Sequence, residues 1–121
     1  MMGVRIEIRS TDQIIREREL HPRGKVQRYI DNAVLRYCDK YVPFRTGKLK
    51  QSGTIHTVIG SGVVKYVTPY AREQYYYNSG RGTQGTARGG LRGRLWFKRM
   101  KAVYKDVILD NARRLSGARR S

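Results

Sequence analysis

The sequence is poor in acidic residues and in cysteine. Its 121 residues include only 9 Asp and Glu against 26 Lys and Arg, which gives a formal net charge of +17 at pH 7. So basic a chain repels itself, and we expect it to act against nucleic acid, an acidic protein surface or an anionic membrane. The single cysteine, Cys38, excludes a small secreted scaffold held by disulfides and favours assembly in a reducing compartment.

Long apolar runs are also missing. No stretch approaches the roughly 20 apolar residues that span a bilayer, and the N-terminus lacks the apolar core of a signal peptide. We therefore expect no membrane partner. The length predicts one domain, which we place at residues 1–115, with residues 116–121 as a basic tail.

Histidines and clustered carboxylates are too scarce for an obvious active site. Neither His21 nor His56 has a Cys, Asp or Glu at metal-ligand spacing. The acids are scattered, whereas a two-metal nuclease needs several that converge. Cys38 lies on an apolar helical stripe, which predicts a buried structural thiol, although the sequence alone leaves a Cys–His nucleophile pair open. We expect no enzyme, no catalytic residue, no metal and no cofactor.

Apolar residues at helical spacing predict two long helices, over residues 25–41 and 95–115. The first stripe consists of Val26, Tyr29, Ile30, Ala33, Val34, Tyr37, Cys38 and Tyr41. The second consists of Trp96, Met100, Val103, Tyr104, Val107 and Ile108. A short helix is expected over residues 12–20, because Ser, Thr and Asp at positions 10–12 are good N-caps.

The remaining patterns indicate strands and turns. Residues 4–9 alternate apolar and charged side chains, as in a half-buried strand. β-Branched residues at 54–59 and 63–68 flank Gly60-Ser61-Gly62, which predicts an antiparallel hairpin. Residues 46–52 read as a short polar turn or one helical turn, and 70–77 as a helical turn followed by a strand. We expect an α+β fold with both long helices packed on a small, mostly antiparallel sheet around the hairpin.

Residues 78–94 are almost devoid of apolar side chains. They contain six glycines and four arginines, with Ala87 and Leu91 as the apolar exceptions. Such a segment buries too little surface to offset its backbone entropy, so we expect a long, mobile Gly/Arg-rich loop. Structureless loops of this length are uncommon in compact domains, which points to a function.

The positive charge is densest in residues 78–121, where 12 basic residues face 2 acidic ones. We expect contacts to DNA phosphates or to an acidic protein, the alternative being a solvated face that aids solubility. The candidate contact residues are Arg81, Arg88, Arg92, Arg94, Lys98, Arg99, Lys101 and Lys105. Nine tyrosines against two phenylalanines suit an interface. The interface candidates are Tyr70, Tyr75, Tyr76 and Tyr77.

Three blocks resemble the minor capsid proteins of tailed bacteriophages. In residues 39–52, a helix ends in Tyr-Val-Pro and is followed by Thr-Gly-x-Leu-x-x-Ser. The stretch Pro69–Tyr76 and the stretch Gly90–Met100, with its Trp-Phe-x-Arg-Met core, are similar to the same group. The blocks come in the same order, and the resemblance runs from about residue 24 to residue 111.

The resemblance implies a structural virion protein made in the bacterial cytoplasm and placed at the head–tail junction. It would act in head–tail joining or tail completion, between the portal, adaptor or stopper side and the tail. Its implied partners are further copies in a closed ring, neighbouring connector and tail proteins, and packaged DNA through non-specific phosphate contacts. We favour a hexamer, with a dodecamer as the alternative. The competing reading is a basic nucleic-acid-binding protein that acts free of a virion, with affinity that falls steeply as salt rises.

Overall fold

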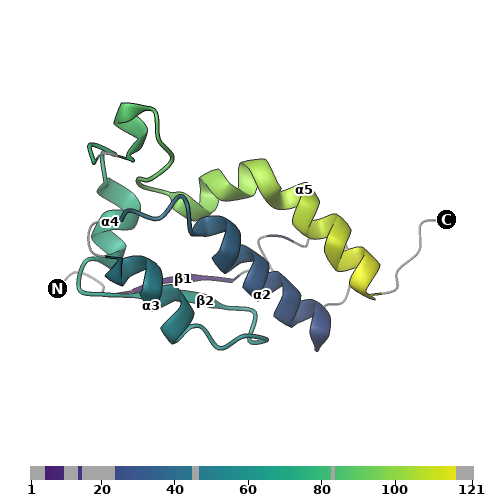
Figure 1. Ribbon diagram of the computed structural model, residues 1–121. Helices are drawn as coiled ribbons and strands as arrows, with labels where there is room; N and C mark the ends of the chain where they lie inside the picture. Colours follow the sequence, from purple (N-terminus) through teal and green to yellow (C-terminus); the bar gives the residue numbers. More distant parts are fainter. Residues whose placement is uncertain (1–4, 10–13, 15–23, 45–46, 83, 117–121) are drawn as a thin grey trace.

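The computed structural model describes residues 5–9, 14, 24–44, 47–82 and 84–116. Over these ranges the chain forms helices and one small antiparallel sheet, so the predicted α+β class is confirmed (Figure 1). The elements in chain order are β1 (Arg5–Ile8), α2 (Lys25–Cys38), α3 (Lys48–His56), β2 (Val64–Val67), α4 (Ala71–Tyr77), the 3-10 turn η1 (Thr86–Arg88) and α5 (Trp96–Ser116).

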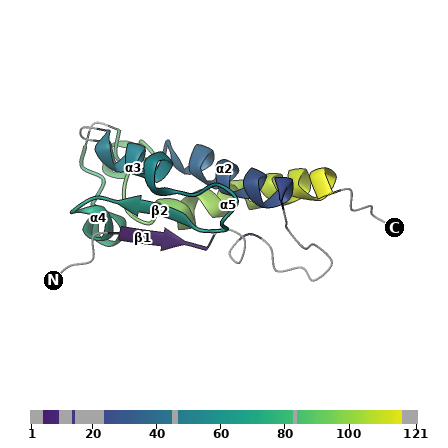
Figure 2. The ribbon, with the colours of Figure 1, turned by 90° about the horizontal axis from the view of Figure 1, so that it is seen from below.

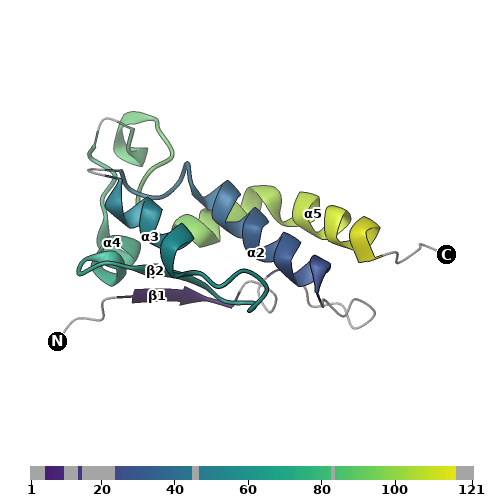
Figure 3. The ribbon, with the colours of Figure 1, turned by 60° about the horizontal axis from the view of Figure 1, so that its bottom comes forward.

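Helices α2 and α5 lie side by side and enclose most of the core (Figures 1 and 3). Both occupy segments where apolar periodicity predicts helix. Ile30 and Val34 of α2 are completely buried, as are Trp96 and Ile108 of α5. The expected 12–20 helix falls outside the described residues except for Ile14, which is buried.

The second helical stripe is partly wrong. Val103 and Val107 are 61% and 44% exposed, although their spacing predicts core positions. Trp96, Met100 and Ile108 of the predicted stripe are buried as expected, and the buried face of α5 also includes Ala112. Helix α2 packs against one side of α5, and the predicted apolar stripe is wider than that contact. Val103 and Val107, at the edge of the stripe, therefore remain exposed to solvent.

Strand β1 pairs antiparallel with β2, with Arg5 opposite Val67 and Ile8 opposite Val64. The alternation at residues 4–9 is confirmed, since Ile6 and Ile8 are buried while Arg5 and Glu7 are exposed. The predicted hairpin over 54–68 is wrong. Residues 54–56 end α3, and β2 pairs with the distant β1 (Figure 2).

Packing explains why a β-rich composition at 54–56 forms a helix. Helix α3 lies directly on β2, and a Cβ added to Gly53 would be 2.6 Å from Cε1 of Tyr66. This close approach requires glycine on the buried helical face, and it outweighs the strand propensity of the neighbouring residues. The polar turn expected at 46–52 is the start of α3, which begins at Lys48.

Side chains of α3 and the next residue close the outer edge of β2. The amide of Val67 donates to Oγ of Ser52 at 3.0 Å, and the amide of Lys65 donates to Oγ1 of Thr57 at 3.0 Å. These amides point away from β1 and, among the described residues, have no strand neighbour on that side. Two hydroxyls therefore replace the bonds that a third strand would make.

Helix α4 (Ala71–Tyr77) covers nearly the whole of segment 70–77, so the strand expected in the second part of that segment is wrong. Residues 78–94 form a loop, as expected, but the described part of it contains the 3-10 turn η1 and internal backbone hydrogen bonds, so it is not structureless. The amide of Thr86 donates to the Arg92 carbonyl, and the amide of Ala87 to the Gly80 carbonyl. A Cβ on Gly85 would lie 2.0 Å from the Gly80 oxygen. Glycine thus lets backbone pack on backbone here, and composition alone does not reveal this.

Candidate partner-binding surfaces

The eight predicted basic contacts differ in exposure. Arg81, Arg88 and Arg94 are exposed on the loop, and Lys98 is exposed in the first turn of α5. The other four, Arg92, Arg99, Lys101 and Lys105, are half-buried. Four of the eight are therefore accessible to a partner, and the other four are partly covered by the protein itself.

Arg92 ties the loop to the end of α2. Its Nη1 donates to the carbonyl oxygens of Asp39 at 2.8 Å and Val42 at 2.6 Å, and its Nε donates to Oε1 of Gln84 at 2.7 Å. Carbonyls after a helix have no intrahelical donor, so the guanidinium satisfies groups that would otherwise need water. Arg92 thus stabilises the fold.

Arg99 ties the same loop to α5. Its Nε donates to the Arg94 carbonyl at 2.8 Å, and its Nη1 donates to the Leu91 carbonyl at 2.6 Å. Burial lowers the pKa of this guanidinium, while Tyr41 and Tyr75 oppose that shift. The guanidinium also lies 5.4 Å above the ring of Tyr41. Arg92 and Arg99 together explain how a loop with few apolar residues is held in place.

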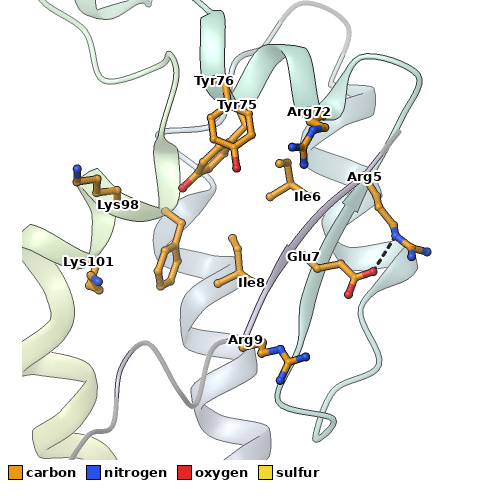
Figure 4. A pocket seen from close by; sticks show the side chains of 11 residues that line it. Arg5, Ile6, Glu7, Ile8, Arg9, Arg72, Tyr75, Tyr76, Lys98 and Lys101 are labelled. Atoms are coloured by element: carbon orange, nitrogen blue, oxygen red, sulfur yellow. Dashed lines mark ion pairs between the residues drawn. The ribbon is translucent and has the colours of Figure 1, made fainter. Parts of the chain in front are cut away.

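Lys98 and Lys101 face an open groove of about 680 Å³ between β1, α4 and α5 (Figure 4). Ile6, Ile8, Tyr75 and Phe97 are its apolar lining. The rim of this groove, called the β1 groove below, carries five basic side chains and one acidic one. The basic residues are Arg5, Arg9, Arg72, Lys98 and Lys101, and the acid is Glu7.

Three basic residues of the groove were not among the contacts predicted from the sequence: Arg5, Arg9 and Arg72. The alternation at residues 4–9 places Arg5 and Arg9 on an exposed strand face, and this pattern could have identified them as candidate contacts. Their nearness to Lys98 and Lys101 follows from β1 lying beside α4 and α5, and those elements are far apart in the chain. Arg5 is paired with Glu7 at 2.7 Å.

A second, shallower hollow of about 410 Å³ lies where the loop meets the end of α2. Arg88 and Arg92 line it together with Lys40. Lys40 Nζ hydrogen-bonds to the hydroxyl of Tyr104, which raises the pKa of Lys40. The hollow is basic, but Arg92 and Lys40 already have internal partners.

Three of the four candidate tyrosines are available to a partner. Tyr70 and Tyr77 are 63% and 71% exposed, and Tyr76 is 42% exposed. Tyr75 is different, because its ring packs edge-on against Trp96 with the centroids 4.6 Å apart. Burial raises the pKa of Tyr75 to about 12. Tyr75 therefore belongs partly to the core.

Four aliphatic side chains that were not predicted to be exposed lie in two pairs, each close in sequence. Ile55 and Val58, 72% and 71% exposed, lie at the end of α3 and just after it. Val103 and Val107 lie one helical turn apart on α5. We call these the α3 patch and the α5 patch.

The structure offers no support for catalysis by Cys38. The thiol is buried, and burial raises its pKa, whereas a reactive cysteine needs accessible thiolate. His56 is exposed on α3. Among the described residues, no three His, Cys, Asp or Glu side chains gather as metal ligands. Within the same part of the chain, no helix is both long and apolar enough to cross a membrane.

Comparison with known proteins gives one match. A family model described as minor capsid protein matches residues 2–113 of the chain. No curated protein and no solved structure matches it.

Proposed function

Since the chain belongs to the minor capsid protein family of bacteriophages, and is thus a structural protein of the virion, we propose that it forms a ring at the head–tail junction. In this role it joins the DNA-filled head, on its portal, adaptor or stopper side, to the tail. The ring is a hexamer, with a dodecamer as the alternative, and its neighbours are connector and tail proteins.

The observation that carries the proposal is the pair of aliphatic patches on different elements. A ring is closed by head-to-tail contacts, in which one surface of a subunit meets a different surface of the next. The α3 patch and the α5 patch are two such surfaces, and both expose apolar side chains that water disfavours. Tyr70, Tyr76 and Tyr77 add contact area near α4.

Charge supports a place between acidic components. A hexamer of this chain would carry roughly +100 before counterions, so a bare ring repels itself. Acidic neighbouring proteins, packaged DNA, or both would neutralise it. The accessible loop residues Arg81, Arg88 and Arg94 are suited to non-specific contacts with phosphates.

The direct test removes the chain from the phage. A stop codon early in its gene should yield DNA-filled heads and separate tails, and adding the purified protein should restore joined, infectious particles. Normal numbers of tailed particles without the chain would contradict the proposal. Failure to package DNA at all would place the chain earlier in assembly than the head–tail junction.

A double variant tests the ring contact. Val103→Glu with Val107→Glu should abolish complementation, because two carboxylates would replace the α5 patch while the core is untouched. Asn32→Glu, at an exposed position of α2, is the matched control and should complement normally. Full activity of the double variant would exclude the α5 patch from the interface.

The alternative of a free nucleic-acid-binding protein gives a different result. Such a protein would bind DNA tightly at low salt, with an affinity that falls steeply as salt rises. It would also be dispensable for head–tail joining.

A further inference from the structure

The two edges of the sheet differ. On β2, the amides of Lys65 and Val67 point outward and bond to hydroxyls near α3. Outward and inward groups alternate along a strand, so the inward groups of β2 belong to Val64 and Tyr66, which face Ile8 and Ile6. By the same alternation, the amides and carbonyls of Arg5 and Glu7 point away from β2.

These outward groups of β1 have no backbone partner in the described residues. An open strand edge presents amides and carbonyls in a row, which is a template for pairing with another chain. The edge adjoins the β1 groove, whose apolar floor includes Ile6, Ile8 and Phe97. A strand added there would gain hydrogen bonds from the edge and apolar contacts from the groove.

The positive charge around the β1 groove indicates what kind of segment can bind there as an added strand. Five basic side chains surround the groove, and its one acid, Glu7, is already paired with Arg5. This field favours an acidic segment over a neutral or basic one. The chain's one pair of acids at alternate positions, Glu17 and Glu19, is interleaved with Arg16 and Arg18, and the chain carries +17, so a second copy is a poor source of an acidic strand.

We propose that the open edge of β1 receives an extended, acidic segment of a different protein as a third strand. Main-chain hydrogen bonds to the outward groups of Arg5 and Glu7 fix the register of that segment. Alternate side chains of the segment contact the apolar floor, and its acids lie on the opposite face of the sheet, beside Arg5 and Arg9. Lys98, Lys101 and Arg72 add to the positive field of the groove. This goes beyond the ring proposal, because it requires only a partner with such a segment.

The probe is a short fluorescent peptide that alternates valine and glutamate, with binding followed by fluorescence anisotropy. Glu7→Pro removes the outward amide of β1 without touching a bond to β2, and proline is tolerated at outward positions of edge strands. Glu7→Ala is the matched control, since it loses the same carboxylate and keeps the amide. We expect Glu7→Pro to bind the peptide about tenfold more weakly than Glu7→Ala.

A second experiment changes the peptide and not the protein, so it tests the proposal even if Glu7→Pro does not fold. Methylating the backbone nitrogens along one edge of the peptide should abolish binding to the parent protein, while methylating the other edge should have little effect. Lys98→Ser with Lys101→Ser should weaken binding of the unmodified peptide.

Three results would overturn the proposal. The first is no binding of the peptide by the parent protein. The second is equal binding of both methylated peptides, which would show attraction by charge alone. The third is displacement of the peptide by a short DNA duplex that binds more tightly, which would make the β1 groove a phosphate surface. Each is read on the isolated protein, so it can fail while the ring proposal stands.

Discussion

The guanidinium of Arg92 lies 2.6 Å from the carbonyl oxygen of Val42, across fifty residues of sequence. The same Nη1 reaches the Asp39 carbonyl at 2.8 Å. One side chain therefore connects the Gly/Arg-rich loop to the end of α2. A residue that the charge distribution predicts as a partner contact instead holds the loop in place.

Removing this guanidinium should destabilise the protein. Arg92→Ala leaves the carbonyls of Asp39 and Val42 without their charged donor, so the free energy of unfolding should fall by about 1–3 kcal/mol. Arg81→Ala, on the same loop but exposed, should change it by less than about 0.5 kcal/mol. Urea titration followed by circular dichroism measures both. Equal stabilities would show that the loop does not depend on Arg92.

Asp31 is a buried acid that organises the segment before β2. Its Oδ2 accepts hydrogen bonds from the amides of Gly60 at 2.8 Å and Gly62 at 3.0 Å. Asp31→Ala should cost about 2 kcal/mol, mainly because the Gly62 amide is buried and would lose this acceptor. Asn32→Ala, next to it on the exposed side of α2, should have little effect. Thermal and urea unfolding should agree, and a neutral Asp31→Ala would contradict this role.

Gly53 sets how closely α3 approaches the sheet. A methyl group there would be 2.6 Å from Cε1 of Tyr66 and 3.0 Å from Cδ2 of Leu35. Gly53→Ala should therefore destabilise by about 1–3 kcal/mol, although alanine favours helix by about 1 kcal/mol. Thr54→Ala, exposed on the same helix, should be neutral or slightly stabilising. The expected urea-titration result is a clear loss of stability for Gly53→Ala and no loss for Thr54→Ala.

The buried phenol of Tyr75 predicts a pH dependence in the alkaline range. Burial raises its folded-state pKa from 10 to about 12, so between these values the folded protein binds more protons than the unfolded one. Stability should therefore be fully present below pH 10 and should fall as pH rises towards 12. Tyr66, whose pKa burial also raises, acts in the same direction.

Tyr75→Phe should make that alkaline decline shallower without removing it. Unfolding by urea across the range gives the slope for both proteins. Well below pH 10, the difference between them should not vary with pH, which serves as the internal control. Parallel declines above pH 10 would show that Tyr75 ionises as easily in the folded state as in the unfolded one.

Periodicity predicted the helical regions well, because α2 and α5 bury side chains such as Ile30 and Ile108 at regular intervals. Periodicity failed to predict α3, because the packing of that helix depends on a residue without a side chain. Gly53 allows α3 to lie on β2, and no pattern of apolar residues marks that requirement. Asp31 is charged and lies off the stripe, yet it is buried because two backbone amides bind it.

The candidate surfaces were predictable only in part. Composition identified the basic loop and the tyrosines, and three sequence blocks indicated the family. Composition did not separate two kinds of arginine in this region. Arg92 and Arg99 bind backbone carbonyls, whereas Arg81 and Arg94 are exposed. The β1 groove joins side chains from three elements, so its charge could be recognised only after the topology was known.

Cryo-electron microscopy of intact virions tests the central claim most directly. The account predicts that copies of this chain form a closed ring between the head and the tail, with the α5 patch of each subunit covered by the next. Copies located in the head shell or along the tail tube, or virions that lack the chain altogether, would contradict it.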